Sequence, residues 1–131
     1  MRTLRILALL AAVGLASSCG GDGGPHAQPG VLTLTLNTPN VDDGALLFRV
    51  VGGPVDSVAG GVMVQDGSYT VQPSYTRIVV AGDITDGVVA GVYIPDVHDA
   101  SSYSVVMEQV AVRNTFAQRS IGGYSIAVSA P

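Results

Sequence analysis

The fold is decided by TRIVVAGDITDGVVAGVYI, residues 76–94, in which two apolar segments flank a polar turn. The first segment, TRIVVAG, directs Ile78 and Val80 to one face and Arg77 to the other, which is typical of a strand with one buried face. The second, VVAGVYI, is apolar on both faces, so we expect a central strand. We interpret the intervening DITDG as a hairpin turn, because Asp-Gly pairs favour tight turns between strands.

The same alternation extends to both sides of this stretch. It recurs in VLTLTL (31–36), ALLFRVV (45–51), SYSVVMEQVAV (102–112) and GYSIAVS (123–129). We expect the buried faces of the first two to carry Leu32, Leu34, Leu36, Leu46, Phe48 and Val50. VDSV, VMVQ and SYTVQ predict shorter strands between residues 55 and 72. We therefore predict an all-β fold, a single antiparallel β-sandwich of seven to nine short strands, with a small barrel as the alternative.

The first 18 residues have the pattern of a cleaved secretory signal peptide. Two arginines precede an eleven-residue apolar run, ILALLAAVGLA, and small residues follow it. The run is shorter than the roughly 20 residues that a membrane-spanning helix needs. LASSC, which ends at Cys19, resembles the bacterial lipobox. The resemblance implies that the thiol of Cys19 is acylated, that the chain is cleaved before it, and that several acyl chains on one residue make membrane release negligible.

Residues 19–30, CGGDGGPHAQPG, predict a flexible tether, because five glycines and two prolines leave little to bury. His26 in this segment is expected to be solvated. Residues 31–131 then form the single β-sandwich domain. The residue after Cys19 is Gly20, and in the lipoproteins that the signal resembles this choice implies the outer membrane. We therefore expect a lipid-anchored protein of the bacterial cell envelope, periplasmic or exposed on the surface.

Charge excludes one class of partner. After residue 18 the chain keeps four arginines, no lysine and ten acidic residues, a formal net charge of −6. Nucleic-acid binding requires clustered cations that neutralise phosphates, so we expect no nucleic-acid partner. We expect the protein to contact the membrane through the lipid at its N-terminus. No pattern in the sequence indicates an oligomeric state.

Two short motifs carry polar groups that could form a site. NVDDG, residues 40–44, offers Asp42 and Asp43 as weak calcium ligands, although the turn lacks the full calcium-loop spacing, and we favour a simple turn. PDVHDAS places His98 between Asp96 and Asp99 in a predicted loop. Such a histidine is usually solvated, and zinc would require three or four His or Cys ligands. We therefore predict no catalytic residue, no metal and no cofactor.

Residues 44–128 resemble a cohesin-like domain. The segments that carry the resemblance are GALLFRVVGGPVDSV, the strands from TRIVVAG to VYIPDV, and the closing GYSIAV. The resemblance implies a β-sandwich that binds a protein module or, as in related families, a carbohydrate. It carries over the fold and no binding residue. We thus expect a non-enzymatic binding or adhesion module for a protein or glycan, with an accessory subunit of an envelope complex as the alternative.

Overall fold

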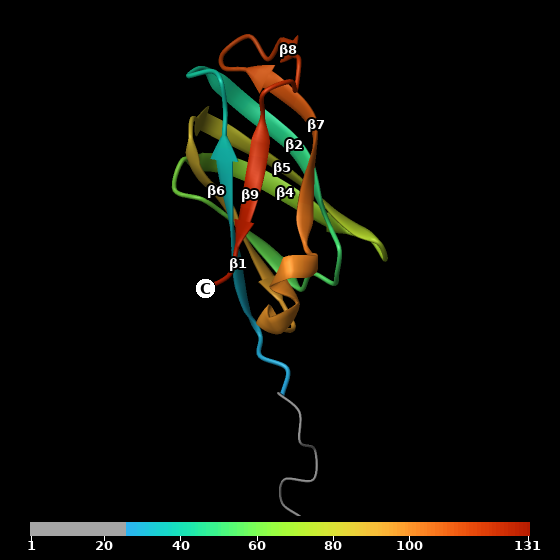
Figure 1. The fold of residues 1–131 in the computed structure, drawn as a ribbon. Coiled ribbons are helices and arrows are strands. Elements are labelled where there is room, and N and C mark those ends of the chain that lie inside the picture. Colours follow the sequence, from blue (N-terminus) through green and yellow to red (C-terminus); the bar gives the residue numbers. More distant parts are fainter. Residues whose placement is uncertain (1–25) are drawn as a thin grey trace, which may run out of the picture.

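The structure, a computed structural model, describes residues 26–131 and consists of two antiparallel sheets packed face to face (Figure 1). The expected signal peptide, the acylation of Cys19 and most of the tether lie outside the described residues. The described part contains nine strands and one short 3₁₀ helix, η1 (Val97–Ser102). No helix in residues 26–131 is long and apolar enough to cross a membrane. The predicted antiparallel β-sandwich is confirmed.

Sheet A has four strands in the order β3-β6-β1-β9. These are β1 (Gly30–Asn37), β3 (Ser57–Gly60), β6 (Gly87–Ile94) and β9 (Ser125–Ser129). Sheet B has five strands in the order β4-β5-β2-β7-β8. These are β2 (Asp43–Val51), β4 (Val64–Val71), β5 (Tyr75–Ile84), β7 (Ser104–Val112) and β8 (Gln118–Arg119).

The core lies between the sheets and is built almost entirely from aliphatic side chains. The residues that alternation assigned to the buried faces of β1, β2 and β5 are each at most 2% exposed: Leu32, Leu34, Leu36, Leu46, Phe48, Val50, Ile78 and Val80. Strand β6 is central, as predicted, because it pairs with β1 and β3. Its outer face is half-exposed at Val88 and Tyr93. Burial of these apolar faces is the main force that stabilises the two-sheet arrangement.

Two local predictions were wrong. DITDG is not a hairpin turn, because β5 belongs to sheet B and β6 to sheet A. The chain crosses there between the sheets, as it does between β1 and β2, and the main-chain N–H of Thr38 donates to Asp86 (2.7 Å) to join the two crossings. VMVQ and SYTVQ, expected as separate pieces, both contribute to the single strand β4, which begins at Val64 within the first motif and ends at Val71 within the second. Its register shifts between Val64 and Asp66. Alternation reports which face is buried, but it does not identify the sheet.

The sandwich has two distinct ends. The described chain enters at the end that carries η1, and the C-terminus lies there too (Figure 1). At this entry end, Gln28 bonds to the residues that begin η1, accepting from the main-chain N–H of Val97 (2.8 Å) and donating to Asp96 (3.2 Å). The opposite end, the far end, carries β8 and the connection that precedes it (Figure 1).

Candidate functional site

The outer face of sheet B contains a row of small side chains that crosses three strands. Ala45 on β2 pairs with Ala81 on β5 and with Ala111 on β7. The row continues to Asp66 on β4, opposite Ala81, and to Gln118 on β8, opposite Ala111. Neighbouring strands lie about 4.8 Å apart, so the row crosses about 19 Å of sheet. Methyl groups therefore form a low floor between larger polar ends.

Larger side chains on both sides turn this floor into a trough. Val79 and Gln109 border it toward the entry end, and Phe116 borders it toward the far end. Depressions of about 380 and 200 Å³ meet at Phe116, and a third of about 230 Å³ lies between β4 and β5. We call the alanine floor with Asp66, Val79, Gln109, Phe116 and Gln118 the outer trough. It is an open site with an apolar floor and amide and carboxylate groups at its rim.

The aromatic ring at the rim belongs to the connection between β7 and β8, residues 113–117. Phe116 is 65% exposed, although its phenyl ring gains nothing from water contact. Its φ of 55° lies in the left-handed region, where a bulky side chain is strained by about 1–2 kcal/mol. Asn114 shares this region with φ 70°, which its short polar side chain tolerates better. Strained residues concentrate at functional sites, and this one displays an exposed ring above the trough.

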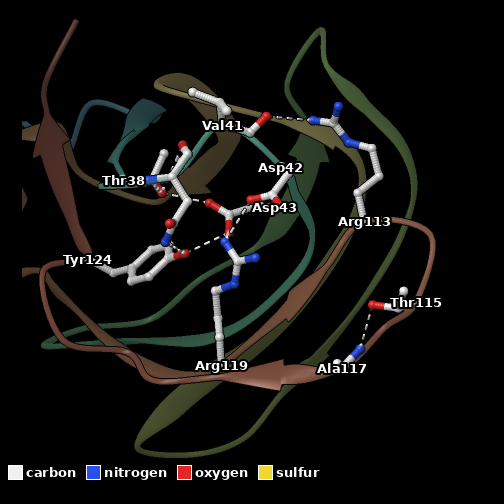
Figure 2. Close-up of polar contacts among 10 residues, drawn as sticks. Thr38, Val41, Asp42, Asp43, Arg113, Thr115, Ala117, Arg119 and Tyr124 are labelled. Atoms are coloured by element: carbon white, nitrogen blue, oxygen red, sulfur yellow. Dashed lines mark hydrogen bonds and ion pairs between the residues drawn. The ribbon is translucent and has the colours of Figure 1, made fainter.

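A buried polar cluster underlies this connection (Figure 2). Asp43, the first residue of β2, is fully buried. Its carboxylate accepts hydrogen bonds from the hydroxyls of Thr38 and Tyr124, both 2.6 Å, and from Nη1 of Arg119 at 3.2 Å. The hydroxyl of Tyr124 in turn accepts from Nδ2 of Asn40 (2.7 Å). These bonds offset the cost of burying a carboxylate, which is several kcal/mol when the charge has no partner.

The cluster fixes both ends of the β7–β8 connection. Arg119 on β8 donates to Asp42 (2.8 Å) as well as to Asp43. This hydrogen bond is the main cause that raises the pKa of the Arg119 guanidinium and lowers the pKa of Asp42. At the start of the connection, the main-chain N–H of Arg113 donates to the carbonyl oxygen of Asp42 (2.7 Å). We infer that Asp42 and Asp43 position Phe116 through the backbone on either side of it.

The calcium candidates Asp42 and Asp43 thus lie together in this cluster, with Arg119 between them. The guanidinium provides the positive charge that a Ca²⁺ ion would provide, and the oxygens of Asp43 already accept three hydrogen bonds. In residues 26–131, no group of three His, Cys, Asp or Glu side chains is arranged for a metal ion. The arrangement favours a structural ion-pair cluster in which Arg119 and Tyr124 lie 76 and 81 residues from Asp43 along the chain.

Sequence reasoning missed Arg119, Tyr124 and the trough. Each alanine of the floor occupies an outward position in a recognisable strand, so its small size was visible. The register that aligns Ala45, Ala81 and Ala111 could not be predicted from the sequence, because it depends on which strands are neighbours. Arg119 lies in a polar stretch of the sequence, and no local feature there indicates that its partner Asp43 is buried.

His98 lies at the entry end, far from the trough along the strands. Its Nδ1 is 2.7 Å from Oδ1 of Asp96, and its main-chain N–H donates to the same oxygen (3.0 Å). Asp96 is the N-cap of η1, and it also accepts from the main chain of Gln28. The main-chain bond from His98 is the largest cause that lowers the pKa of Asp96. These contacts account for the Asp-x-His motif as a local cap. His26 is exposed.

A charged cluster borders the trough on the entry-end side. A register shift leaves Glu108 of β7 without an opposite residue on β2, and its carboxylate pairs with both Arg49 on β2 and Arg77 on β5. Nε of Arg77 lies 3.2 Å from Oε2 of Glu108, and Nε of Arg49 lies 3.6 Å from Oε1. Both guanidinium groups also lie 5.4–6.0 Å from the ring centre of Tyr75. The carboxylate and the ring offset the repulsion between two arginines that pair directly across β2 and β5.

Comparison of the chain with protein-family models, curated proteins and solved structures found no match. The functional conclusion therefore depends on the geometry of the sandwich and on the pattern of the sequence.

Proposed function

We propose that the chain is a bacterial lipoprotein, anchored to the cell envelope through acylated Cys19, whose sandwich is a non-catalytic module that binds a glycan in the outer trough. The observation that carries the proposal is the trough itself. It combines a methyl floor, an exposed aromatic ring and polar groups on one open face.

The chemistry of the trough suits a sugar. A pyranose ring has apolar C–H faces and a rim of hydroxyls, so it needs both apolar and hydrogen-bonding contacts. The ring of Phe116 and the floor of Ala45, Ala81 and Ala111 offer the apolar surface. The amides of Gln109 and Gln118 both donate and accept, and the carboxylate of Asp66 accepts. A crossing of about 19 Å accommodates an extended oligosaccharide better than a single small molecule.

The position of the trough suits display from a membrane. The lipid would be attached at Cys19, only a few residues before the entry end, where the described chain begins. The β7–β8 connection, which contains Phe116, lies toward the opposite end of the sandwich (Figure 1). A strand rises about 3.4 Å per residue, so the eight residues of β1 separate the two ends by about 25 Å. The anchored module would therefore present its binding surface away from the lipid.

Binding rather than catalysis is supported by how the charged groups are engaged. Asp83, at the far-end border of the trough, pairs with Arg113 at 3.3 Å. Glycoside hydrolysis needs two carboxyl groups that face each other across the sugar bond. The histidine of the domain, His98, is occupied with the cap at the entry end.

Glycan binding is tested by a glycan array followed by titration calorimetry of the hits with the Cys19→Ser chain. We expect the Phe116→Gly variant to lose binding at least tenfold, because about 1.4 kcal/mol of contact energy corresponds to that factor. Val88→Ala, which removes an exposed side chain from β6 of sheet A, the sheet that does not carry the trough, is the control and should bind normally. Binding that survives both Phe116→Gly and Gln118→Ala would place the ligand elsewhere.

Anchoring is tested separately, by mass spectrometry of the amino terminus after membrane extraction. We expect the chain to start at Cys19 with acyl groups on this residue. Globomycin, which blocks the lipoprotein signal peptidase, should cause the precursor to accumulate, and Cys19→Ser should release the protein from the membrane fraction. A mature chain that starts at another residue, or that has a free thiol, would refute the anchor and leave the glycan test unaffected.

A further inference from the structure

Strand β4 is an edge strand whose free side is unusually accessible. Within the described sheets, the edge strands are β3 and β9 in sheet A and β4 and β8 in sheet B. β4 has eight residues, and the other three have between two and five. Every residue from 65 to 71 is exposed, including Tyr69 at 43% and Val71 at 46%. Short β3 leaves the inner face of β4 largely uncovered.

The free main-chain groups of β4 can be assigned from its turn. The N–H of Gln72 donates to the carbonyl of Tyr75 (2.8 Å), which makes this a hydrogen-bonded pair. Hydrogen-bonded and non-bonded pairs alternate along an antiparallel ladder. The pairs that follow therefore direct the N–H and C=O groups of Gly67, Tyr69 and Val71 away from β5. These three residues form a row at the edge of sheet B that makes no strand pairing. The N–H of Gly67 donates instead to Oδ1 of the neighbouring Asp66 (2.8 Å), an exposed side chain that can rotate away.

Natural edge strands are usually protected against pairing by Lys, Pro, inward charges or bulges. Residues 67–71, GSYTV, contain none of these residues and no charge. Asp66 and the register shift beside it lie just before this stretch. The stretch is thus a regular, uncharged edge of five residues.

We propose that a second copy of the chain pairs with this edge, β4 against β4 in antiparallel orientation, around a twofold axis at Tyr69. The residues are complementary in this register. Gly67 faces Val71 of the second copy, and a small residue thus meets a branched one. Ser68 faces Thr70, and Asp66 faces the neutral Gln72, so no like charges lie opposite each other.

The hollow beside the edge supports the same register. A depression of about 460 Å³ lies between β3 and β4 and is bordered by Val58, Gly67 and Tyr69, with Ile78 at its base. Gly67 has no side chain to fill it. In the paired register, Val71 of the second copy comes opposite Gly67, so its isopropyl group covers the hollow. The same contact occurs twice because of the symmetry, and apolar surface that is now exposed becomes buried in both copies.

The register is tested by charge exchange at the axis, with all variants made in the Cys19→Ser chain. Alone, Tyr69→Asp and Tyr69→Arg should each be folded monomers by circular dichroism and sedimentation, because equal charges would meet at the axis. Mixed in equal amounts, they should form a heterodimer. The dimer fraction of the parent chain should rise with protein concentration. Concentrations up to about 1 mM are needed, because an edge interface of small area binds weakly.

A cysteine at the axis gives an independent measurement. The described chain has no cysteine, so Tyr69→Cys introduces a single thiol that should form an intermolecular disulfide under mild oxidation. Val62→Cys, also exposed, should crosslink far more slowly. A parent chain that stays monomeric at the highest concentration overturns the proposal and leaves the edge to an extended peptide of another protein. Folded charge variants whose mixture stays monomeric overturn it as well.

Discussion

Asp43 at the far end and Asp96 at the entry end have similar bonds and very different surroundings. Each carboxylate accepts three hydrogen bonds. Two of the three donors to Asp96 come from His98, two residues away, and the side chain of Asp96 is partly exposed. The donors to Asp43 lie up to 81 residues away, and Asp43 is fully buried. One carboxylate caps a short helix, whereas the other joins segments that only the tertiary fold brings together.

The comparison shows that different interactions stabilise the two ends of the sandwich. At the far end, side chains of the polar cluster connect the β1–β2 crossing with β8 and with the segment before β9. At the entry end, the backbone itself is closely packed, because Gly52 lies directly against the carbonyl oxygen of Ser102. The hydroxyl of Tyr103 also donates to the carbonyl of Pro54 (2.6 Å). Substitutions at the two ends should therefore differ in kind and in size.

The largest effect is expected for Gly52→Ala at the entry end. The φ of Gly52 is 109°, which an alanine rarely adopts, and its Cβ would collide with the Ser102 carbonyl. We expect a loss of about 4 kcal/mol in the free energy of unfolding, measured by urea denaturation. Gly122→Ala, in more open surroundings, is the control and should cost far less. A loss below about 1 kcal/mol for Gly52→Ala would contradict the close backbone contact.

The next largest effect is expected for Asp43→Ala. The change leaves the hydroxyls of Thr38 and Tyr124 without their acceptor in a buried site, and we expect a loss of about 3 kcal/mol. Asp96→Ala removes an equal number of bonds from a site open to solvent, and its loss should be much smaller. Thermal and urea denaturation of the two variants measure the difference. Equal losses would show that burial does not distinguish the two carboxylates.

A finer comparison uses one hydroxyl at each end. Tyr124→Phe removes a bond to a charged carboxylate and a bond from Asn40, and we expect it to cost about 2 kcal/mol. Tyr103→Phe removes a bond to the neutral carbonyl of Pro54, and we expect about 1 kcal/mol. Both variants keep the aromatic ring, so packing is matched. A larger loss for Tyr103→Phe would reverse our ranking of the two ends.

The smallest effect is a pH dependence at the entry end. Hydrogen bonds from His98 and Gln28 lower the pKa of Asp96 below its ordinary value of 3.8. The cap therefore contributes its full stability above pH 3.8, and the contribution is lost as the pH falls through the lower folded pKa. NMR titration of the Gln28 and His98 amides should show a shared midpoint below 3.8, absent in Asp96→Asn. A midpoint above 3.8 would contradict these bonds.

The same two carboxylates show how much could be predicted from the sequence. Strands and their buried faces were predictable, because alternation at Leu32, Leu46 and Ile78 is a local property. The bonds between Asp96 and His98 were predictable as well, because these residues are only two positions apart in the sequence. The partners of Asp43, the crossing at DITDG and the alignment of the three alanines depend on strand order and register. These are properties of the whole sandwich, and no local pattern encodes them.

The position of β1 has a mechanical consequence. This strand follows the chain entry directly and lies between β6 and β9, antiparallel to both. A load applied between the entry end and the outer trough runs along the strands, whereas the hydrogen bonds of β1 lie across them. The bonds on both sides of β1 are then loaded together in shear and cannot open one by one. A protein held at its amino end and pulled at its opposite end would resist extension better than one pulled sideways.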